Sequence, residues 1–137
     1  MAPEPQHVCR PIELLLIEDN PVDVLLFRLA LADEPYSINL RVASSGQEAM
    51  RMLPEERPDL VILDLNLPQL SGLSFLERNR TTVPVVVFSC SCCDDDIRRS
   101  FELGARDFVP KASDLDTYMR LVSYIVRTWG VPELPMA

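Results

Sequence analysis

The chain has 137 residues, 47% of them apolar and 25% charged, which fits one globular domain with a buried core. Its longest apolar runs fall well short of the roughly 20 residues needed to cross a bilayer, so we expect no membrane span and a cytoplasmic location. The formal net charge of −8 argues against nucleic acid as a partner, because that binding depends mainly on clustered Lys and Arg.

Five short apolar runs, rich in Leu or in β-branched residues, alternate with helical segments along the chain. Near-continuous apolarity of this kind is typical of parallel strands covered by helices on both faces. The expected strands are 12–17, 38–43, 60–63, 83–88 and 107–109.

Helix signals lie between these runs. Asn20 followed by Pro21 is a favourable N-cap and first-turn pair, which predicts a first helix over 22–32. The other expected helices are 46–53, 71–80, 94–103 and 113–129. Five βα units predict an α/β fold with a doubly wound, five-stranded parallel sheet flanked by five helices. We expect one domain at 12–129, an irregular arm at 1–11, an irregular tail at 130–137, and no output domain.

Three of the four cysteines, Cys90, Cys92 and Cys93, lie within four residues of one another. Cys90 and Cys93 form a C-x-x-C pair, a pattern found in redox sites and in half of a zinc site. No second ligand pair is nearby, because His7 and Cys9 belong to the arm. We therefore interpret the cluster as reduced, buried thiols at a strand end.

Polar and charged side chains follow the carboxyl ends of the predicted strands, where parallel α/β sheets hold their functional sites. Glu18 and Asp19 follow the first strand, Asp64 the third and Lys111 the fifth, while Ser89 closes the fourth. Three carboxylates at one edge would repel each other unless a cation lay among them. Hard oxygen ligands favour Mg²⁺ over Zn²⁺. Taken alone, Glu18 and Asp19 would read as an acidic helix start, but Asp64 at the same edge favours the metal site.

The residues around Asp64 suggest phosphoryl chemistry. Asp64 ends a buried strand and can act as a nucleophile on phosphorus, with the metal and Lys111 offsetting charge on the transferring oxygens. Lys111 is the single lysine among thirteen basic residues, which indicates a need for a compact ammonium. Ser89 is expected to bond the phosphoryl group. Structural alternatives are a loop cap for Asp64 and a turn bond for Ser89.

The motifs IEDNPVD, VILDLNLPQLSG, VVVFS and GARDFVPK resemble, in this order, the receiver domains of two-component response regulators. The resemblance spans about residues 11–129. It implies a flavodoxin-like (β/α)₅ receiver fold with strand order 2-1-3-4-5 and a phosphoacceptor at Asp64. It also implies Mg²⁺ ligation by Asp19, Asp64 and the Asn66 carbonyl, with Glu18 acting through water and Mn²⁺ as a substitute ion.

The same resemblance implies how the phosphoryl group is handled. Ser89 and Lys111 would contact it, and Phe108 matches the aromatic switch that turns inward when Ser89 moves. The donor would be a sensor histidine kinase or a phosphorelay carrier, and the motifs look most like regulators paired with phytochrome-type kinases. Where the family usually has proline after Lys111, this chain has Ala112, so a trans peptide with a shifted loop is expected.

The main alternative is a Mg²⁺-dependent phosphatase or phosphotransferase with an aspartyl-phosphate intermediate. The Asp-x-Asp that such enzymes usually carry after their first strand is absent. Asn66 stands where a second acid would be needed, so we expect a phosphoacceptor rather than a turnover enzyme.

The last predicted helix carries more apolar surface than a sheet requires. One stripe, expected to cover the sheet, consists of Leu115, Met119, Val122 and Val126. A second stripe beside it consists of Tyr118, Leu121, Ile125 and Trp129. We expect part of the second stripe to pack on the fourth helix, through Ile97 and Phe101, and the rest to form a homodimer surface with the fourth helix and fifth strand.

Overall fold

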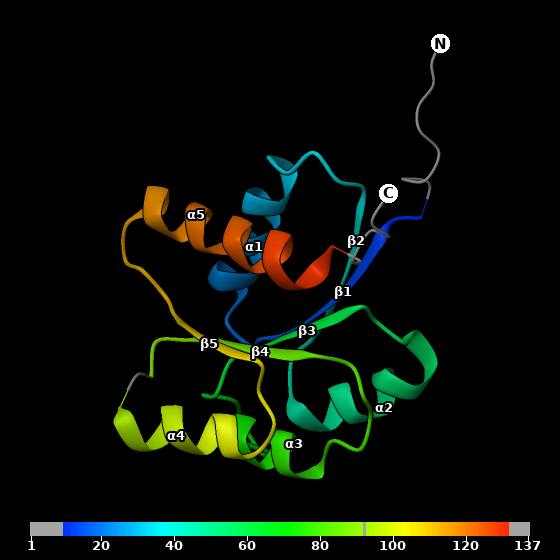
Figure 1. The fold of residues 1–137 in the computed structure, drawn as a ribbon, viewed down its shortest axis with the longest axis vertical. Helices are drawn as coiled ribbons and strands as arrows, with labels where there is room; N and C mark the ends of the chain where they lie inside the picture. Colours follow the sequence, from blue (N-terminus) through cyan, green and yellow to red (C-terminus); the bar gives the residue numbers. More distant parts are fainter. Residues whose placement is uncertain (1–9, 92, 132–137) are drawn as a thin grey trace, which may run out of the picture.

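Strands and helices alternate along the computed structural model, which describes residues 10–91 and 93–131 (Figure 1). Five strands form one parallel sheet in the order β2-β1-β3-β4-β5. They are β1 (Ile12–Ile17), β2 (Ile38–Ala43), β3 (Leu60–Leu63), β4 (Val85–Ser89) and β5 (Asp107–Pro110). The predicted fold class and strand order are confirmed. Residues 1–9 of the expected arm and 132–137 of the expected tail lie outside the described residues, as does Cys92.

Helices cover both faces of the sheet (Figure 1). They are α1 (Pro21–Ala32), α2 (Gly46–Glu56), α3 (Gly72–Arg78), α4 (Asp94–Glu102) and α5 (Leu115–Ile125), which continues as one π-helical stretch, η2 (Val126–Gly130). α1 and α5 pack together on one face, whereas α2, α3 and α4 lie on the other. No helix in the described ranges is long and apolar enough to cross a membrane.

The core has two halves because alternate residues of a strand point to opposite faces. Leu14 and Ile62 face α1 and α5, while Leu15 and Val61 face α2 and α3. The central strands β3 and β4 are buried along their whole length. This burial explains the near-continuous apolar runs from which the parallel sheet was predicted.

Several element boundaries differ from the prediction by a few residues, and two of the differences have clear local reasons. β4 begins at Val85 rather than at residue 83, because Pro84 has no N–H to donate to the ladder. α5 begins at Leu115 because Asp114 is its N-cap, with a carboxylate that accepts a 2.9 Å hydrogen bond from the Thr117 N–H.

The predicted orientation of the last helix is only partly correct, since Val122 and Val126 are buried as expected but other residues of the two stripes are not placed as predicted. Tyr118 and Ile125, assigned to the lateral stripe, are buried in the core, whereas Leu115, assigned to the sheet-facing stripe, is 52% exposed. The Tyr118 ring packs 5.3 Å from the Phe88 ring, centroid to centroid. The expected packing on the fourth helix is also wrong, because α5 packs on α1 and α4 lies across the sheet (Figure 1).

Candidate functional site

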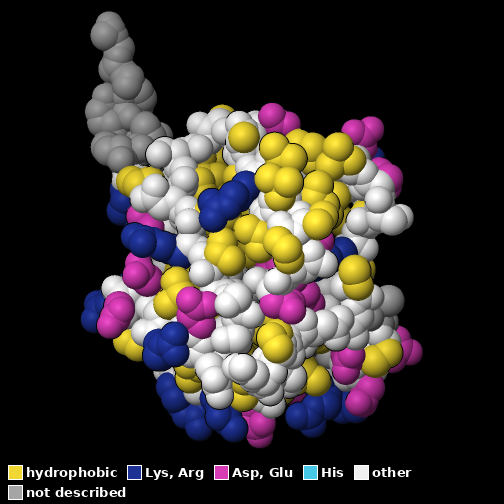
Figure 2. Space-filling view, turned by 180° about the vertical axis from the view of Figure 1, so that it is seen from behind, with side chains coloured by type: hydrophobic (Ala, Val, Ile, Leu, Met, Phe, Trp, Pro, Cys, Tyr) yellow, Lys and Arg dark blue, Asp and Glu magenta, His cyan; other side chains and the backbone are white. Residues whose placement is uncertain are grey.

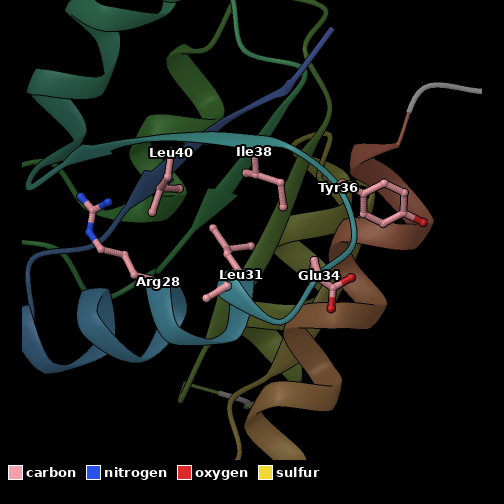
Figure 3. A pocket seen from close by; sticks show the side chains of 7 residues that line it. Arg28, Leu31, Glu34, Tyr36, Ile38 and Leu40 are labelled. Atoms are coloured by element: carbon pink, nitrogen blue, oxygen red, sulfur yellow. The ribbon is translucent and has the colours of Figure 1, made fainter. Parts of the chain in front are cut away.

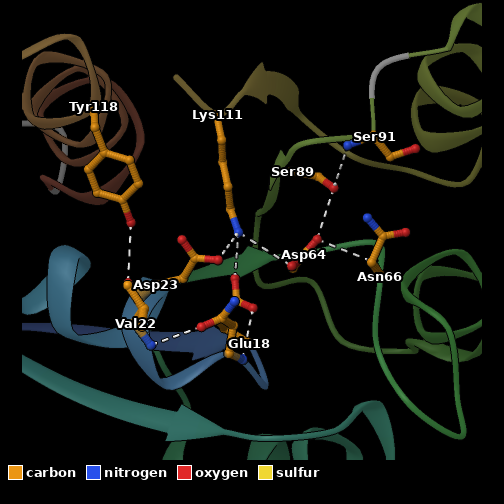
Figure 4. A network of polar contacts seen from close by, with 10 residues as sticks. Glu18, Val22, Asp23, Asp64, Asn66, Ser89, Ser91, Lys111 and Tyr118 are labelled. Atoms are coloured by element: carbon orange, nitrogen blue, oxygen red, sulfur yellow. Dashed lines mark hydrogen bonds and ion pairs between the residues drawn. The ribbon is translucent and has the colours of Figure 1, made fainter. Parts of the chain in front are cut away.

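The residues predicted to share a site converge at the carboxyl edge of the sheet (Figure 4). Strand register brings them together, since Ile17 pairs with Leu63 and Leu63 with Val87. Backbone bonds extend the ladder past the strand ends: the Asp64 N–H donates to the Ile17 carbonyl at 3.1 Å, and the Lys111 N–H donates to the Ser89 carbonyl at 3.0 Å. These backbone bonds therefore fix the positions from which the Asp64 and Lys111 side chains extend into the site.

Three carboxylates form a cluster at this edge. Glu18, Asp19 and Asp64 each offer one oxygen, and these oxygens lie within 4.8 Å of one another. Glu18 and Asp64 are buried, while Asp19 is exposed at the mouth of the cluster. A few hard oxygen donors with one side open to water are what Mg²⁺ prefers, since it keeps several water ligands. The donor set therefore fits the predicted metal.

Lys111 supplies the positive charge within the cluster. Its Nζ donates to Glu18 Oε1 at 2.7 Å, to Asp23 Oδ2 at 3.1 Å and to Asp64 Oδ2 at 3.4 Å. Burial alone would lower the pKa of Lys111, but the hydrogen bond and negative charge of Glu18, with the charge of Asp64, raise it overall. The side chain therefore remains an ammonium ion.

Glu18 has an unusual pKa for a carboxylic acid. Burial raises the pKa of Glu18 to about 7, with a further rise from the Asp64 charge, although the Lys111 ammonium and the Asn20 N–H partly oppose the shift. A proton and a metal ion therefore compete for this part of the cluster near neutral pH.

We predict that Mg²⁺ affinity falls as the pH drops through 7. Protonation removes the Glu18 charge, so the apparent affinity should fall by about tenfold between pH 7.5 and pH 6. Titration calorimetry at both pH values measures this loss. Glu18→Gln should bind more weakly but nearly equally at the two pH values, and a wild type with flat affinity would contradict the prediction.

Asp64 receives hydrogen bonds from both sides of the cluster (Figure 4). Its Oδ1 accepts from the Ser89 hydroxyl at 2.9 Å and from the Asn66 N–H at 3.1 Å, while its Oδ2 faces Lys111. Ser89 Oγ also accepts from the Ser91 N–H at 3.2 Å. Ser89 therefore makes the turn bond considered from sequence and also directs its hydroxyl at the Asp64 carboxylate.

The loop after Asp64 folds back closely on itself. The Gly72 N–H donates to the Leu65 carbonyl at 3.0 Å. A Cβ at position 72 would lie 2.6 Å from the Leu65 Cα, so glycine is required by this approach. The tight return fixes the backbone that carries Asp64 and Asn66.

Two further sequence expectations concern the β5 end of the site. The described residues contain no cis peptide bond, so the trans linkage expected between Lys111 and Ala112 is confirmed. Phe108 is half-buried against the α2, α3 and α4 half of the core. Its role as a switch aromatic stays a prediction.

The cysteine interpretation needs one correction. Cys90 and Cys93 are free thiols, but both are exposed rather than buried, because β4 already ends at Ser89. Across the described ranges, no cysteine belongs to a group placed to hold a metal ion. This placement counts against the zinc reading.

Sequence reasoning missed Asp23. It lies in the first turn of α1, and its carboxylate accepts one of the three hydrogen bonds of Lys111. A signal was available, since Asp23 falls in the first turn of the helix that Asn20 and Pro21 predict, directly after the Glu18-Asp19 pair at the strand end.

A groove elsewhere on the molecule is separate from this site. It has a volume of ≈360 Å³ and is lined by α1 residues Arg28 and Leu31 and by Tyr36, Ile38 and Leu40 around the start of β2 (Figure 3). The start of a parallel strand lies at the edge opposite its carboxyl end. The groove therefore takes no part in the chemistry of the carboxylate cluster.

Comparison with solved structures agrees with this fold. A phosphorylated cyanobacterial phytochrome response regulator, RcpA, matches with a TM-score of 0.81 and 33% identity, over 88% of this chain and 94% of that chain. The Mn²⁺-bound form of response regulator Rcp1 matches with a TM-score of 0.79 and 29% identity, over 92% of this chain and 100% of that chain.

Comparison with curated proteins and family models identifies the domain. The transcriptional regulatory protein KdpE of Mycobacterium tuberculosis is 35% identical over 124 residues, which cover 88% of this chain and 54% of KdpE. A protein-glutamate methylesterase/protein-glutamine glutaminase of Trichodesmium erythraeum is 30% identical, and the match covers 33% of it. The chain thus spans about half or less of these relatives. A model of the response regulator receiver domain matches residues 14–123, and the chain belongs to that family.

Proposed function

We propose that this receiver domain accepts a phosphoryl group on Asp64. The observation that carries the proposal is the environment of this carboxylate: two hydrogen-bond donors contact Oδ1, an ammonium faces Oδ2, and two more carboxylates lie beside it. Such a group is held in place as a nucleophile while cationic charge is available for the transferring oxygens.

The transfer follows from these contacts. An oxygen of Asp64 attacks phosphorus of a phosphohistidine, forming the O–P bond while the N–P bond breaks and the imidazole leaves. Mg²⁺ held by Glu18, Asp19, Asp64 and the Asn66 carbonyl would offset charge on the phosphoryl oxygens. Lys111 and Ser89 then turn from the carboxylate to the new phosphoryl oxygens. Mn²⁺ would substitute for Mg²⁺ at this site, which the Mn²⁺-bound form of Rcp1 supports.

A chemical test separates a phosphoacceptor from a phosphatase. With Mg²⁺ and acetyl phosphate, the protein should gain one hydroxylamine-sensitive phosphoryl group by intact mass, and chelation of the metal should prevent it. Steady hydrolysis of p-nitrophenyl phosphate should be negligible, because Asn66 stands where such phosphatases carry their second acid. Rapid catalytic hydrolysis without a single labelled species would favour the phosphatase.

The donor is proposed to be a sensor histidine kinase or a phosphorelay carrier in the cytoplasm. The likeness to RcpA and Rcp1 supports a phytochrome-type kinase in particular. Val22, Leu25 and Leu29 on α1 are all at least half exposed, at the spacing of one helical face. They form an exposed apolar face on α1, and Figure 2 shows hydrophobic side chains gathered in its upper half. This surface begins next to Asp19 and suits a docking protein.

A homodimer through α4, β5 and α5 remains our proposal for the output surface, with different anchors from those first expected. Phe101 on α4 and Tyr124 on α5 are 47% and 45% exposed. We predict dimers by sedimentation at micromolar concentration and at least a tenfold weaker association for Phe101→Asp, because losing an aromatic hot spot at the centre of an interface costs about 2 kcal/mol or more. Leu25→Asp on α1 is the matched control. A wild type that stays monomeric with and without phosphorylation would remove this proposal.

A further inference from the structure

The Lys111 ammonium has no spare donor. An ammonium carries three N–H donors, and here they meet Glu18, Asp23 and Asp64. A phosphoryl oxygen on Asp64 can therefore bind Lys111 only if one of these partners is given up or weakened. The identity of the partner released decides how easily the ammonium reaches the phosphoryl group.

The bond from Lys111 to Asp64 is the longest and passes to the phosphoryl group itself, and of the two shorter bonds the one to Asp23 is the more readily released. The Asp23 side chain is 25% exposed, against 2% for Glu18 and 9% for Asp64. Water can therefore replace the ammonium at Asp23 at lower cost than at the two buried carboxylates. Asp23 is also not one of the three carboxylates whose oxygens lie within 4.8 Å of one another.

Asp23 is held in place by the helices α1 and α5, whereas the acceptor Asp64 lies at the end of strand β3. The Asn20 side chain caps α1 by accepting from the Val22 N–H at 2.9 Å. The buried Tyr118 hydroxyl of α5 donates to the Asp23 carbonyl at 3.3 Å. These bonds fix the start of α1 independently of the loop that follows Asp64, and Figure 4 shows Lys111 reaching down between Asp23 and Asp64.

We propose that Asp23 is a positioning residue for Lys111, holding the ammonium toward α1 until a phosphoryl group on Asp64 takes it. Among the described residues, Lys111 is the only basic partner within ion-pair distance of Asp23. Asp23 thus competes with the phosphoryl group for one cation. The proposal rests on the proposed phosphoacceptor function of Asp64.

Removing the competing charge should favour the phosphorylated geometry. Asp23→Asn keeps the size of the side chain and loses the charge that holds Lys111. With Mg²⁺ present, the variant should bind beryllofluoride, a phosphoryl mimic, about three- to fivefold more tightly, the range expected for one partly exposed ion pair.

The single lysine allows the ammonium to be observed directly. Protein labelled with ¹⁵Nζ-lysine gives one ammonium signal from Lys111. Without metal, this signal in Asp23→Asn should move from the wild-type position toward the position that wild type reaches with Mg²⁺ and beryllofluoride. Asp23→Glu should restore the wild-type position, and Asp116→Asn, which removes an exposed acid from α5, should change neither the signal nor the affinity.

The possible results distinguish a failure of the proposed role of Asp23 from a failure of the proposed phosphoacceptor function of Asp64. Suppose that the wild type binds beryllofluoride, that Asp23→Asn binds it no more tightly, and that the metal-free Lys111 signal of Asp23→Asn stays at the wild-type position. This result would overturn the role of Asp23 and leave the phosphoacceptor function of Asp64 standing. A wild type whose Lys111 signal ignores Mg²⁺ with beryllofluoride overturns both the phosphoacceptor site and this inference.

Discussion

Lys111→Arg should phosphorylate on the order of ten- to a hundredfold more slowly than wild type although it keeps the positive charge. The Lys111 side chain is 6% exposed, and its Nζ meets three carboxylates that approach from α1, β1 and β3. A planar guanidinium is larger and directs its donors within one plane, so it cannot replace a compact ammonium among them. The rate of labelling by acetyl phosphate at saturating Mg²⁺ measures the effect.

A matched control separates chemistry from folding. Arg106→Lys makes the reverse exchange at an exposed position and should label at the wild-type rate. Thermal unfolding of Lys111→Arg shows whether the fold survives the substitution. A folded Lys111→Arg that is labelled at the wild-type rate and still responds to phosphorylation would mean that charge alone suffices at this position.

The sequence predicted the sheet and most of the site because both depend on simple rules. Parallel strands buried on both faces must be apolar throughout, and their carboxyl ends meet at one edge. Glu18, Asp64, Ser89 and Lys111 could therefore be placed together from their positions after apolar runs. The structure links these four residues in one chain of side-chain hydrogen bonds, from Ser89 through Asp64 and Lys111 to Glu18.

The orientation of α5 could not be predicted in the same way. Helical periodicity defines the width of an apolar arc but not which half of it faces the sheet. Tertiary contacts decide this, since Tyr118 packs on Phe88 and its hydroxyl reaches the Asp23 carbonyl. Tyr118 is therefore a core residue, and a charged side chain at this position would damage the fold.

Ion pairing inside the site was predicted only in part. The lone lysine indicated a compact cation at position 111, but residue types alone do not show how its donors are divided. Glu18 and Asp23 take the two shorter bonds, and Asp64 the longest. The sharing of the Lys111 donors depends on where α1 lies relative to β5. Asn20 and Pro21 predict where α1 begins along the chain, but they do not predict its position relative to β5.

Asp64→Asn should abolish phosphorylation. An amide has no anionic oxygen to attack phosphorus, yet asparagine keeps the shape of the side chain and a carbonyl oxygen for the Ser89 hydroxyl and the Asn66 N–H. The loss should therefore come from chemistry rather than from unfolding. Wild-type and variant proteins of equal thermal stability would establish that point.

The location of the phosphoryl group tests the central claim most directly. After labelling with acetyl phosphate and Mg²⁺, borohydride reduction converts an acyl phosphate to a homoserine that peptide mass spectrometry can place. We predict homoserine at position 64 in wild type, and neither label nor homoserine in Asp64→Asn. Homoserine at position 19, or undiminished labelling of Asp64→Asn, would contradict Asp64 as the phosphoacceptor.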